Sequence, residues 1–199
     1  MVFRKLLGVL VFCSAVSAFG QTIPQGSFGG VPVTLGVGYS YFSSDWNSSP
    51  LGKGGWIGGP MVWGNFTFYR APSVLAGIGI EVQGRNLNYG RTGSDPVLRQ
   101  TTGLGGVIYK WRRFPHVQPY GKILGGFGGI WFTTTDPYYH HDTRTVVAQA
   151  LGVDFILGTN VIIRADFENQ NWSDLMGYHS LTPRGVTFSV AYDFKQHPR

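Results

Sequence analysis

Apolar side chains recur at every second position along most of this chain, and this alternation restricts the possible folds more than any other feature. In residues 33–41, Val, Leu and Tyr alternate with Thr, Gly and Ser. In residues 186–194, Val, Phe and Tyr alternate with Thr, Ser, Ala and Asp. Successive residues of a β-strand point to opposite faces, whereas a helix repeats about every 3.6 residues. The pattern therefore predicts strands with one apolar face and argues against a mainly helical fold.

Six more strands are expected between these two, which gives eight in all. The connections alternate in length, because long polar segments rich in Asp, Asn, Ser, Gly and Pro are followed by short ones. Outer-membrane barrels combine long external loops with short periplasmic turns in this way, and an even number of strands would leave both termini periplasmic. The expected strands are 33–41, 57–70, 74–87, 98–111, 118–133, 145–157, 161–172 and 186–194. The expected loops are 43–56, 88–97, 134–144 and 173–183, and the short turns are 71–73, 112–117 and 158–160.

The composition of the polar face indicates which way the strands point. A soluble ligand-binding barrel, which is apolar inside, would also alternate. Only 13% of the residues are charged, against about 25% in a typical soluble domain. The polar face is mostly small, which suits the narrow lumen of eight strands, so we expect it to point inward. Its small members are Gly36, Gly38, Gly77, Gly79, Ala148, Gly152, Ser189 and Ala191. The face expected to meet hydrocarbon carries Ile78, Ile80, Val82, Val147, Leu151, Val153, Phe155, Val161, Ile163 and Phe167.

Aromatic residues gather near the expected strand ends, as in the belts that mark the two interfaces of a membrane. On the loop side these are Trp56, Trp131 and Trp172, and on the turn side Trp111, Tyr120 and Phe194. The facing of the fourth strand stays open. Leu104 and Ile108 compete there with Val107 and Tyr109 for the apolar face, and a bulge would account for the conflict.

The first twenty residues have the pattern of a cleaved secretory signal peptide. Arg4 and Lys5 precede an apolar run that is too short for a transmembrane helix, and small residues follow it. Cleavage would leave one domain, residues 21–199, without Cys13, the only cysteine, and so without a disulfide or a thiolate site. The formal net charge would fall from +6 to +4. The remaining positive charges are scattered, which argues against nucleic acid as a partner.

Across essentially its whole mature length, the chain resembles the small eight-stranded outer-membrane barrels of the OmpA-like and opacity-protein-like group. The resemblance rests on the signal peptide, the strand pattern, the stretch GIGIEVQGR at 77–85 and the last strand VTFSVAYDF at 186–194. It implies an all-β, eight-stranded antiparallel up-and-down transmembrane barrel. It also implies that the aromatic Phe194 is read by the outer-membrane insertion machinery, and that a salt-bridged plug fills the lumen and allows at most a small conductance.

Eight charged residues fall on the inward face, three positive and five negative. Isolated charges in a confined lumen are costly, so we expect ion pairs or hydrogen-bonded networks. The specific hypothesis is that Arg85 and Arg164 bridge Glu81, Asp166 and Glu168. The predicted lumen charges are Glu81, Arg85, Lys122, Asp154, Arg164, Asp166, Glu168 and Asp193.

A catalytic alternative rests on Asp166 and Glu168, which are about 6 to 7 Å apart along one strand face. Paired carboxylates at such a separation serve glycosidases. Eight strands leave no cleft for a sugar, however, so a polar barrel wall explains the pair better. Lipid A deacylases of similar size use His and Ser two residues apart, whereas His179 and Ser180 are adjacent.

Two further motifs are weak. His140, His141 and Asp142 lack a spaced third ligand, so a solvated loop is favoured over a metal site. The glycine-rich run 125–129 lacks the helix and the Lys-Ser/Thr of a phosphate loop. The sequence therefore predicts no enzyme and no cofactor. It predicts a monomeric outer-membrane barrel with a structural or surface-interaction role, whose exposed loop residues Trp46, Tyr138 and Tyr139 are candidates for contact with a ligand. A lipid-modifying enzyme and a soluble periplasmic ligand-binding barrel remain the alternatives.

Overall fold

The described residues form nine antiparallel strands, of which eight make up a barrel wall. The computed structural model describes residues 33–45, 55–67, 77–89, 98–114, 116–132, 141–158, 160–175 and 179–194. Within these ranges, no helix is long and apolar enough to cross a membrane. The strands are β1 (Val33–Ser43), β2 (Trp56–Thr67), β3 (Ile78–Tyr89), β4 (Leu98–Lys110), β5 (Val117–Phe132), β6 (His141–Leu157), β7 (Val161–Leu175), β8 (His179–Leu181) and β9 (Arg184–Phe194).

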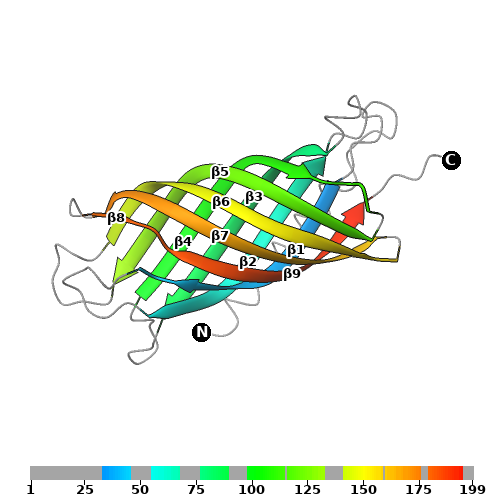
Figure 1. The fold of residues 1–199 in the computed structure, drawn as a ribbon. Helices are drawn as coiled ribbons and strands as arrows, with labels where there is room; N and C mark the ends of the chain where they lie inside the picture. Colours follow the sequence, from blue (N-terminus) through cyan, green and yellow to red (C-terminus); the bar gives the residue numbers. More distant parts are fainter. Residues whose placement is uncertain are drawn as a thin grey trace, which may run out of the picture. The chain divides into compact units, whose positions relative to one another are not determined.

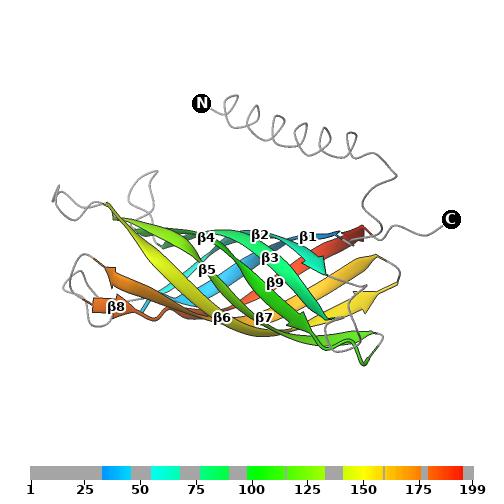
Figure 2. The same cartoon turned by 90° about the horizontal axis from the view of Figure 1, so that it is seen from above.

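The sheet closes on itself. Each strand from β1 to β7 pairs with the next one along the chain, and β9 pairs with both β7 and β1. Figures 1 and 2 show that these strands are tilted relative to the long axis of the barrel. Following directly paired residues once round the wall from Val33 leads back to β1 at Ser43, ten residues further on. This stagger is the shear that a closed barrel of tilted strands requires.

The predicted fold class, an eight-stranded antiparallel up-and-down barrel, is confirmed. Most described strand bounds lie within two residues of the expected ones, but β3 begins at Ile78, four residues later than expected. β6 begins at His141, four residues earlier than expected, β7 continues to Leu175, and the short β8 adds a ninth strand beside the end of β7. Residues 68–76, between β2 and β3, lie outside the described residues. The turn 71–73, the signal peptide 1–20 and Trp46, Tyr138 and Tyr139 lie outside the described residues.

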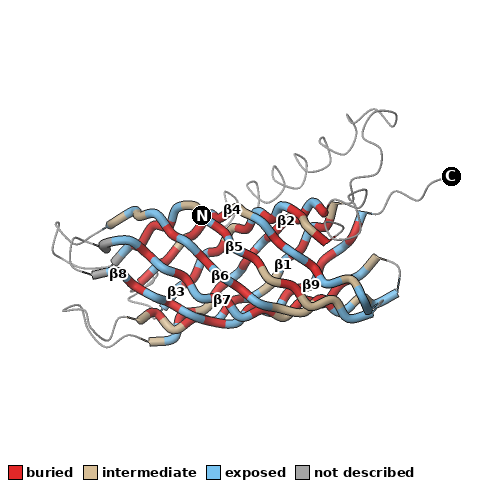
Figure 3. The backbone as a smooth tube through the Cα atoms, turned by 45° about the horizontal axis from the view of Figure 1, so that its top comes forward, coloured by how far each residue is buried: buried red, intermediate tan, exposed pale blue. Residues whose placement is uncertain are grey.

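Burial alternates along most of each barrel strand, as Figure 3 shows in the succession of buried and exposed residues, although residues 128–130 of β5 are all buried. The small polar face points inward and the large apolar face outward, in agreement with the predicted facing. On β4, Leu104 and Ile108 are buried, whereas Val107 and Tyr109 are exposed. Pairing of β4 with both neighbours is continuous, so no bulge is present. The conflict in the sequence arose because the lumen itself is partly apolar.

Two of the predicted interface aromatics were placed on the wrong face. Trp172 and Tyr120 are buried inside the barrel, with only 0% and 4% of their surface exposed. Glycines on nearby strands make room for them. A Cβ added to Gly128 would lie 2.1 Å from the Trp172 ring, and one added to Gly152 would lie 2.4 Å from the Tyr120 hydroxyl. Both aromatics therefore fill the lumen and cannot mark a membrane interface.

An apolar cluster fills the loop end of the lumen, where β1 ends and β2 begins. Phe42, Ile57 and Trp172 belong to it, and each is at most 1% exposed. A smaller cluster, including Met61 and Trp63, lies nearer the opposite end, here called the turn end. The charged layer described next lies among these apolar groups. The other members of the larger cluster, called here the apolar plug, are Leu87, Leu98, Leu104, Leu124, Ile130, Val146, Ala148 and Leu181.

Candidate functional site

The interior of the barrel is the most unusual part of the described structure, because it holds nine buried charged side chains. The eight predicted lumen residues are all among them, and Lys110 is the one member of the group that was not predicted. None is more than 5% exposed. They come from strands all round the wall: Glu81 and Arg85 from β3, Lys110 from β4, Lys122 from β5, Asp154 from β6, Arg164, Asp166 and Glu168 from β7, and Asp193 from β9.

Arg164 is fully buried and bridges two carboxylates from different strands. Its Nε and Nη2 donate to the two oxygens of Asp154 at 2.7 and 3.1 Å, and its Nη1 donates to Oε2 of Glu81 at 2.7 Å. The guanidinium also stacks at 3.5 Å over the Trp63 ring and 4.5 Å from that of Tyr120. The planar fork of arginine suits such simultaneous pairing and stacking. Arg164 therefore links three strands through one side chain.

Lys122 is the second cationic centre. Its Nζ donates to Oε1 of Glu81 at 2.8 Å, to Oδ2 of Asp166 at 3.1 Å and to Oε1 of Gln83 at 3.1 Å. These three bonds use all the donors of an ammonium group. The Tyr120 hydroxyl donates to the same Asp166 oxygen at 2.9 Å. Glu81 thus receives both Lys122 and Arg164, and it joins the two cationic centres.

Arg85 holds Glu168 through two hydrogen bonds, and Gln83 connects this pair to the rest. Nε2 of Gln83 donates to Glu168 at 2.8 Å while its oxygen accepts from Lys122. The specific pairing hypothesis is therefore wrong in one respect. Arg85 and Arg164 bind Glu168 and Glu81, but Asp166 is bound by Lys122, because the stagger of the strands brings β5 to that position.

Lys110 was not predicted to lie in the lumen, although the alternation along β4 could have placed it there. It donates to Oδ2 of Asp154 at 2.9 Å at the turn end of the charged layer. It shares the inward face of β4 with Ile108, two residues away, whose facing the sequence left open. Asp193 also lies toward the turn end, where Thr34 donates to its carboxylate at 3.4 Å. The charged layer therefore extends further toward the turn end than expected.

The arrangement is suited to filling space and holding strands, and it offers little to chemistry. Asp166 and Glu168 are each held by a cation and each buried, so the carboxylate pair does not face a cleft. One oxygen of Asp166, Oδ1, is buried without a hydrogen-bond partner among the described residues. In the described ranges, no three His, Cys, Asp or Glu residues group as a metal site would require.

The outer wall carries aromatic residues at both ends of the barrel. Trp56, Trp111, Trp131 and Phe194, predicted as interface aromatics, are all exposed, between 38% and 52%. At the loop end, Trp56 stacks on Tyr41 at 4.9 Å, and at the turn end Phe194 makes an edge contact with Tyr192 at 4.9 Å. Between these ends the exposed surface is mostly Val, Ile, Leu and Phe. An apolar band with aromatic borders is the outer surface expected of a transmembrane barrel.

The loop end of the barrel presents several exposed polar groups. Arg99 at the start of β4 is exposed, and Arg144 on β6 donates to Asp142 at 2.9 Å with 37% of its side chain exposed. Asp45, which has a positive φ of 54°, accepts hydrogen bonds from the backbone and hydroxyl of Thr182. This contact fastens the segment after β1 to the segment before β9.

No family model matches the chain, and no curated protein sequence matches it. Solved structures match in fold. Neisserial surface protein A matches with a TM-score of 0.61 and 13% identity over 82% of this chain and 96% of that one. Ail, the attachment invasion locus protein of Yersinia pestis, matches with 0.59 and 16% over 82% and 99%. The outer-membrane protein OprG of Pseudomonas aeruginosa matches with 0.51 and 12% over 83% and 97%. The predicted resemblance to small eight-stranded outer-membrane barrels is thereby confirmed at the level of the fold.

Proposed function

We propose that this protein is a non-enzymatic outer-membrane barrel whose closed lumen makes it a rigid scaffold and whose loop end is its interaction surface. The observation that carries the proposal is the filled interior: a connected charge network lies beneath an apolar plug, while the outer wall is apolar. Rigid barrels commonly present their binding residues on loops. Residues 1–20 act as the signal peptide, both termini are periplasmic, and the protein is monomeric.

The closed lumen argues against a pore. The side chains of Trp172, Phe42 and Ile57 fill the loop end of the lumen, and each is at most 1% exposed. Nine charged side chains occupy the lumen between this plug and the turn end. An ion would have to separate pairs such as Arg164 and Glu81 to pass, which is unfavourable in an environment of low dielectric constant. We therefore expect a conductance close to zero, and at most brief small openings.

A polyanionic glycan is the class of surface ligand that the loop end favours. Arg99 is exposed there and Arg144 is half-buried, with 37% of its side chain exposed. Arginine side chains bind sulfate and phosphate groups through paired hydrogen bonds. One solved structure of Ail, which has 18% identity and a TM-score of 0.55 to this chain, contains the heparin analogue sucrose octasulfate. That ligand is a suitable first probe.

Fractionation of expressing cells tests the location. The protein is expected to stay in the outer-membrane fraction through salt and carbonate washes and to need detergent for release. On gels it is expected to change its migration after boiling, since the folded barrel resists unfolding. Release by carbonate alone would favour the soluble periplasmic barrel. Altered lipid A in the membranes of expressing cells would favour the lipid-modifying enzyme.

Two measurements on purified protein test the role. In planar bilayers the native barrel is expected to show no steady conductance, and steady channels would contradict the closed scaffold. Retention on immobilised heparin is expected to fall when Arg99 and Arg144 are both replaced by Ser. The matched control is Arg112→Ser/Arg113→Ser, which removes two arginines at the turn end. Equal losses in both variants would indicate charge attraction without a site at the loop end.

A further inference from the structure

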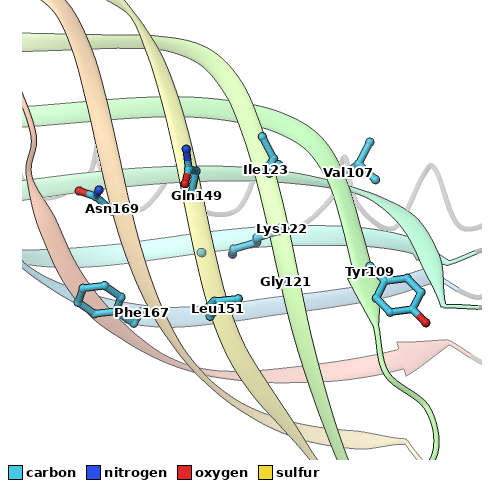
Figure 4. Close-up of a pocket in the computed structure, with 10 residues that line it drawn as sticks. Val107, Tyr109, Gly121, Lys122, Ile123, Gln149, Leu151, Phe167 and Asn169 are labelled. Atoms are coloured by element: carbon cyan, nitrogen blue, oxygen red, sulfur yellow. The ribbon is translucent and has the colours of Figure 1, made fainter.

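The outer wall carries a groove where a smooth apolar surface is expected. It has a volume of about 550 Å³ and lies across β4 to β7, within the range of about 300 to 1,000 Å³ typical of ligand pockets. Gly121 leaves space in the groove, since a Cβ added there would make only ordinary contacts, with the Leu151 side chain at 3.4 Å and the Ala150 carbonyl at 4.0 Å. Figure 4 shows Val107, Ile123 and Leu151 along the groove, with Gln149 and Asn169 on neighbouring strands.

The polar lining is unusual because of its position. Gln149 and Asn169 are directly paired across β6 and β7, and both are exposed on the outer face. On its own strand, Gln149 lies between Leu151 and Val147, which are exposed and apolar at 72% and 46%. Gln149 therefore lies within the apolar band of the wall and does not belong to its rim.

Within the described part of the chain, the side chains of Gln149 and Asn169 make no hydrogen bond to another residue. Hydrocarbon supplies no donors or acceptors, so a side-chain amide facing lipid tails without a partner is costly. Two such amides lie side by side at the edge of the groove, where a polar group of a bound molecule would satisfy them.

Gln149 and Asn169 belong to a row of directly paired residues on neighbouring strands, and the next residue in that row is an arginine. Next to Asn169, on β9, is Arg184, which is exposed and is the first residue of its strand at the loop end. Because the barrel is staggered, each step along this row also approaches the loop end. The order along it is apolar wall at Val107 and Ile123, then the two amides, then the arginine.

We propose that the groove binds an outer-leaflet glycolipid of the lipid A type, with phosphorylated sugars and hydroxyacyl chains. Its acyl chain lies along Val107, Ile123 and Leu151. Its amide linkage and the hydroxyl group of its acyl chain hydrogen-bond to Gln149 and Asn169. One of its phosphate groups pairs with Arg184. This order of apolar, amide and anionic groups matches the order of groups on the wall. The proposal rests on the proposed placement in the outer membrane with the loop end outward.

The amides favour this lipid over a phospholipid. A carboxamide both donates and accepts hydrogen bonds. The acyl linkages of a glycerophospholipid are esters, which accept only, so they leave the amide oxygens unsatisfied. Hydroxyacyl chains with amide linkages carry O–H and N–H donors as well as carbonyl acceptors. They can therefore satisfy both halves of each side chain.

Native mass spectrometry of the purified full chain tests the site, with lipid A and phosphatidylglycerol as separate titrants. Lipid A is expected to bind about tenfold more tightly than phosphatidylglycerol, and the Gln149→Leu/Asn169→Leu variant to lose about tenfold in lipid A affinity. Gly121→Leu, which fills the groove, and Arg184→Gln are expected to weaken lipid A binding as well. The controls are Asn86→Leu and Gly84→Leu, on the outer face of β3 away from the groove, which are expected to bind like the native protein.

Equal affinity for both lipids, or undiminished lipid A binding in both the double variant and Gly121→Leu, would overturn the proposal. Equal losses in the β3 controls would do the same, because they would show a general effect of the outer wall. Folding of each variant is checked by its migration before and after boiling. Should the double variant fail to fold, Gly121→Leu and Arg184→Gln decide the outcome. Binding is measured on purified protein, so its failure is distinct from a failure of the proposed cellular location.

Discussion

Arg85 and Glu168 form a fully buried bidentate ion pair across the barrel lumen. Nη1 and Nη2 of Arg85 donate to the two carboxylate oxygens at 2.7 and 3.1 Å, and both side chains are 0% exposed. Removing one partner leaves an uncompensated charge, which typically costs about 3 to 5 kcal/mol. We expect Arg85→Met and Glu168→Gln each to lower the free energy of unfolding by about this amount, measured by urea titration in detergent micelles.

The combined Arg85→Met/Glu168→Gln variant is the control for this first prediction. Because each single change already removes the pair, the double variant should lose clearly less than the sum of the two single losses. Losses that add to within about 0.5 kcal/mol would contradict the coupling.

Replacing Arg164 should destabilise the barrel more than replacing Lys110. Arg164→Met deprives both Glu81 and Asp154 of hydrogen bonds, with an expected loss of about 3 to 5 kcal/mol. Lys110→Met leaves Asp154 with both of its bonds from Arg164, so a loss of about 1.5 to 3 kcal/mol is expected. Urea midpoints of the two variants under identical conditions check the order. A larger effect of Lys110→Met would mean that the layer is centred nearer the turn end.

The position of Trp172 depends on the absence of a side chain at Gly128. We expect Gly128→Ala to destabilise the barrel by about 1 to 3 kcal/mol, because its Cβ would overlap the Trp172 ring. In the Trp172→Leu background the same glycine change should cost much less. Gly103→Ala is the matched control, since its Cβ would have no neighbour within 4 Å. An equal cost of Gly128→Ala with and without the tryptophan would contradict the packing.

The alternation in the sequence predicted the strands and their facing well, because period two is a local property of each strand. Two residues were placed wrongly because the expectation that aromatics near strand ends lie at the membrane interface was given priority over the alternation. Trp172 shares the inward face of β7 with Arg164, Asp166, Glu168 and Gln170, yet its place near a strand end suggested an interface aromatic. Tyr120 was misplaced for the same reason, although Lys122 on the same face was placed inside. Facing along the strand was the better guide in both cases.

The alternation along single strands could not predict which cation pairs with which carboxylate in the lumen. Lys122 meets Asp166 because the registers of β5 with β6 and of β6 with β7 add up around the barrel. No local pattern contains that sum. The apolar plug was also unexpected, because its members, such as Leu104 and Phe42, look like lipid-facing residues when one strand is considered alone.

The central claim is that one face of every strand meets lipid while the other closes the lumen, and isoleucine methyl groups test it most directly. The δ1-methyl groups are labelled in protein held in nanodiscs, and their NMR signals are recorded with and without lipids that carry a paramagnetic group on the acyl chain. Ile80, Ile123 and Ile163 are exposed, and their signals should broaden strongly. Ile108, Ile130 and Ile162 are at most 5% exposed, and their signals should persist. Ile162 and Ile163 are neighbours on β7, so equal broadening of these two, or the reverse order, would contradict the account.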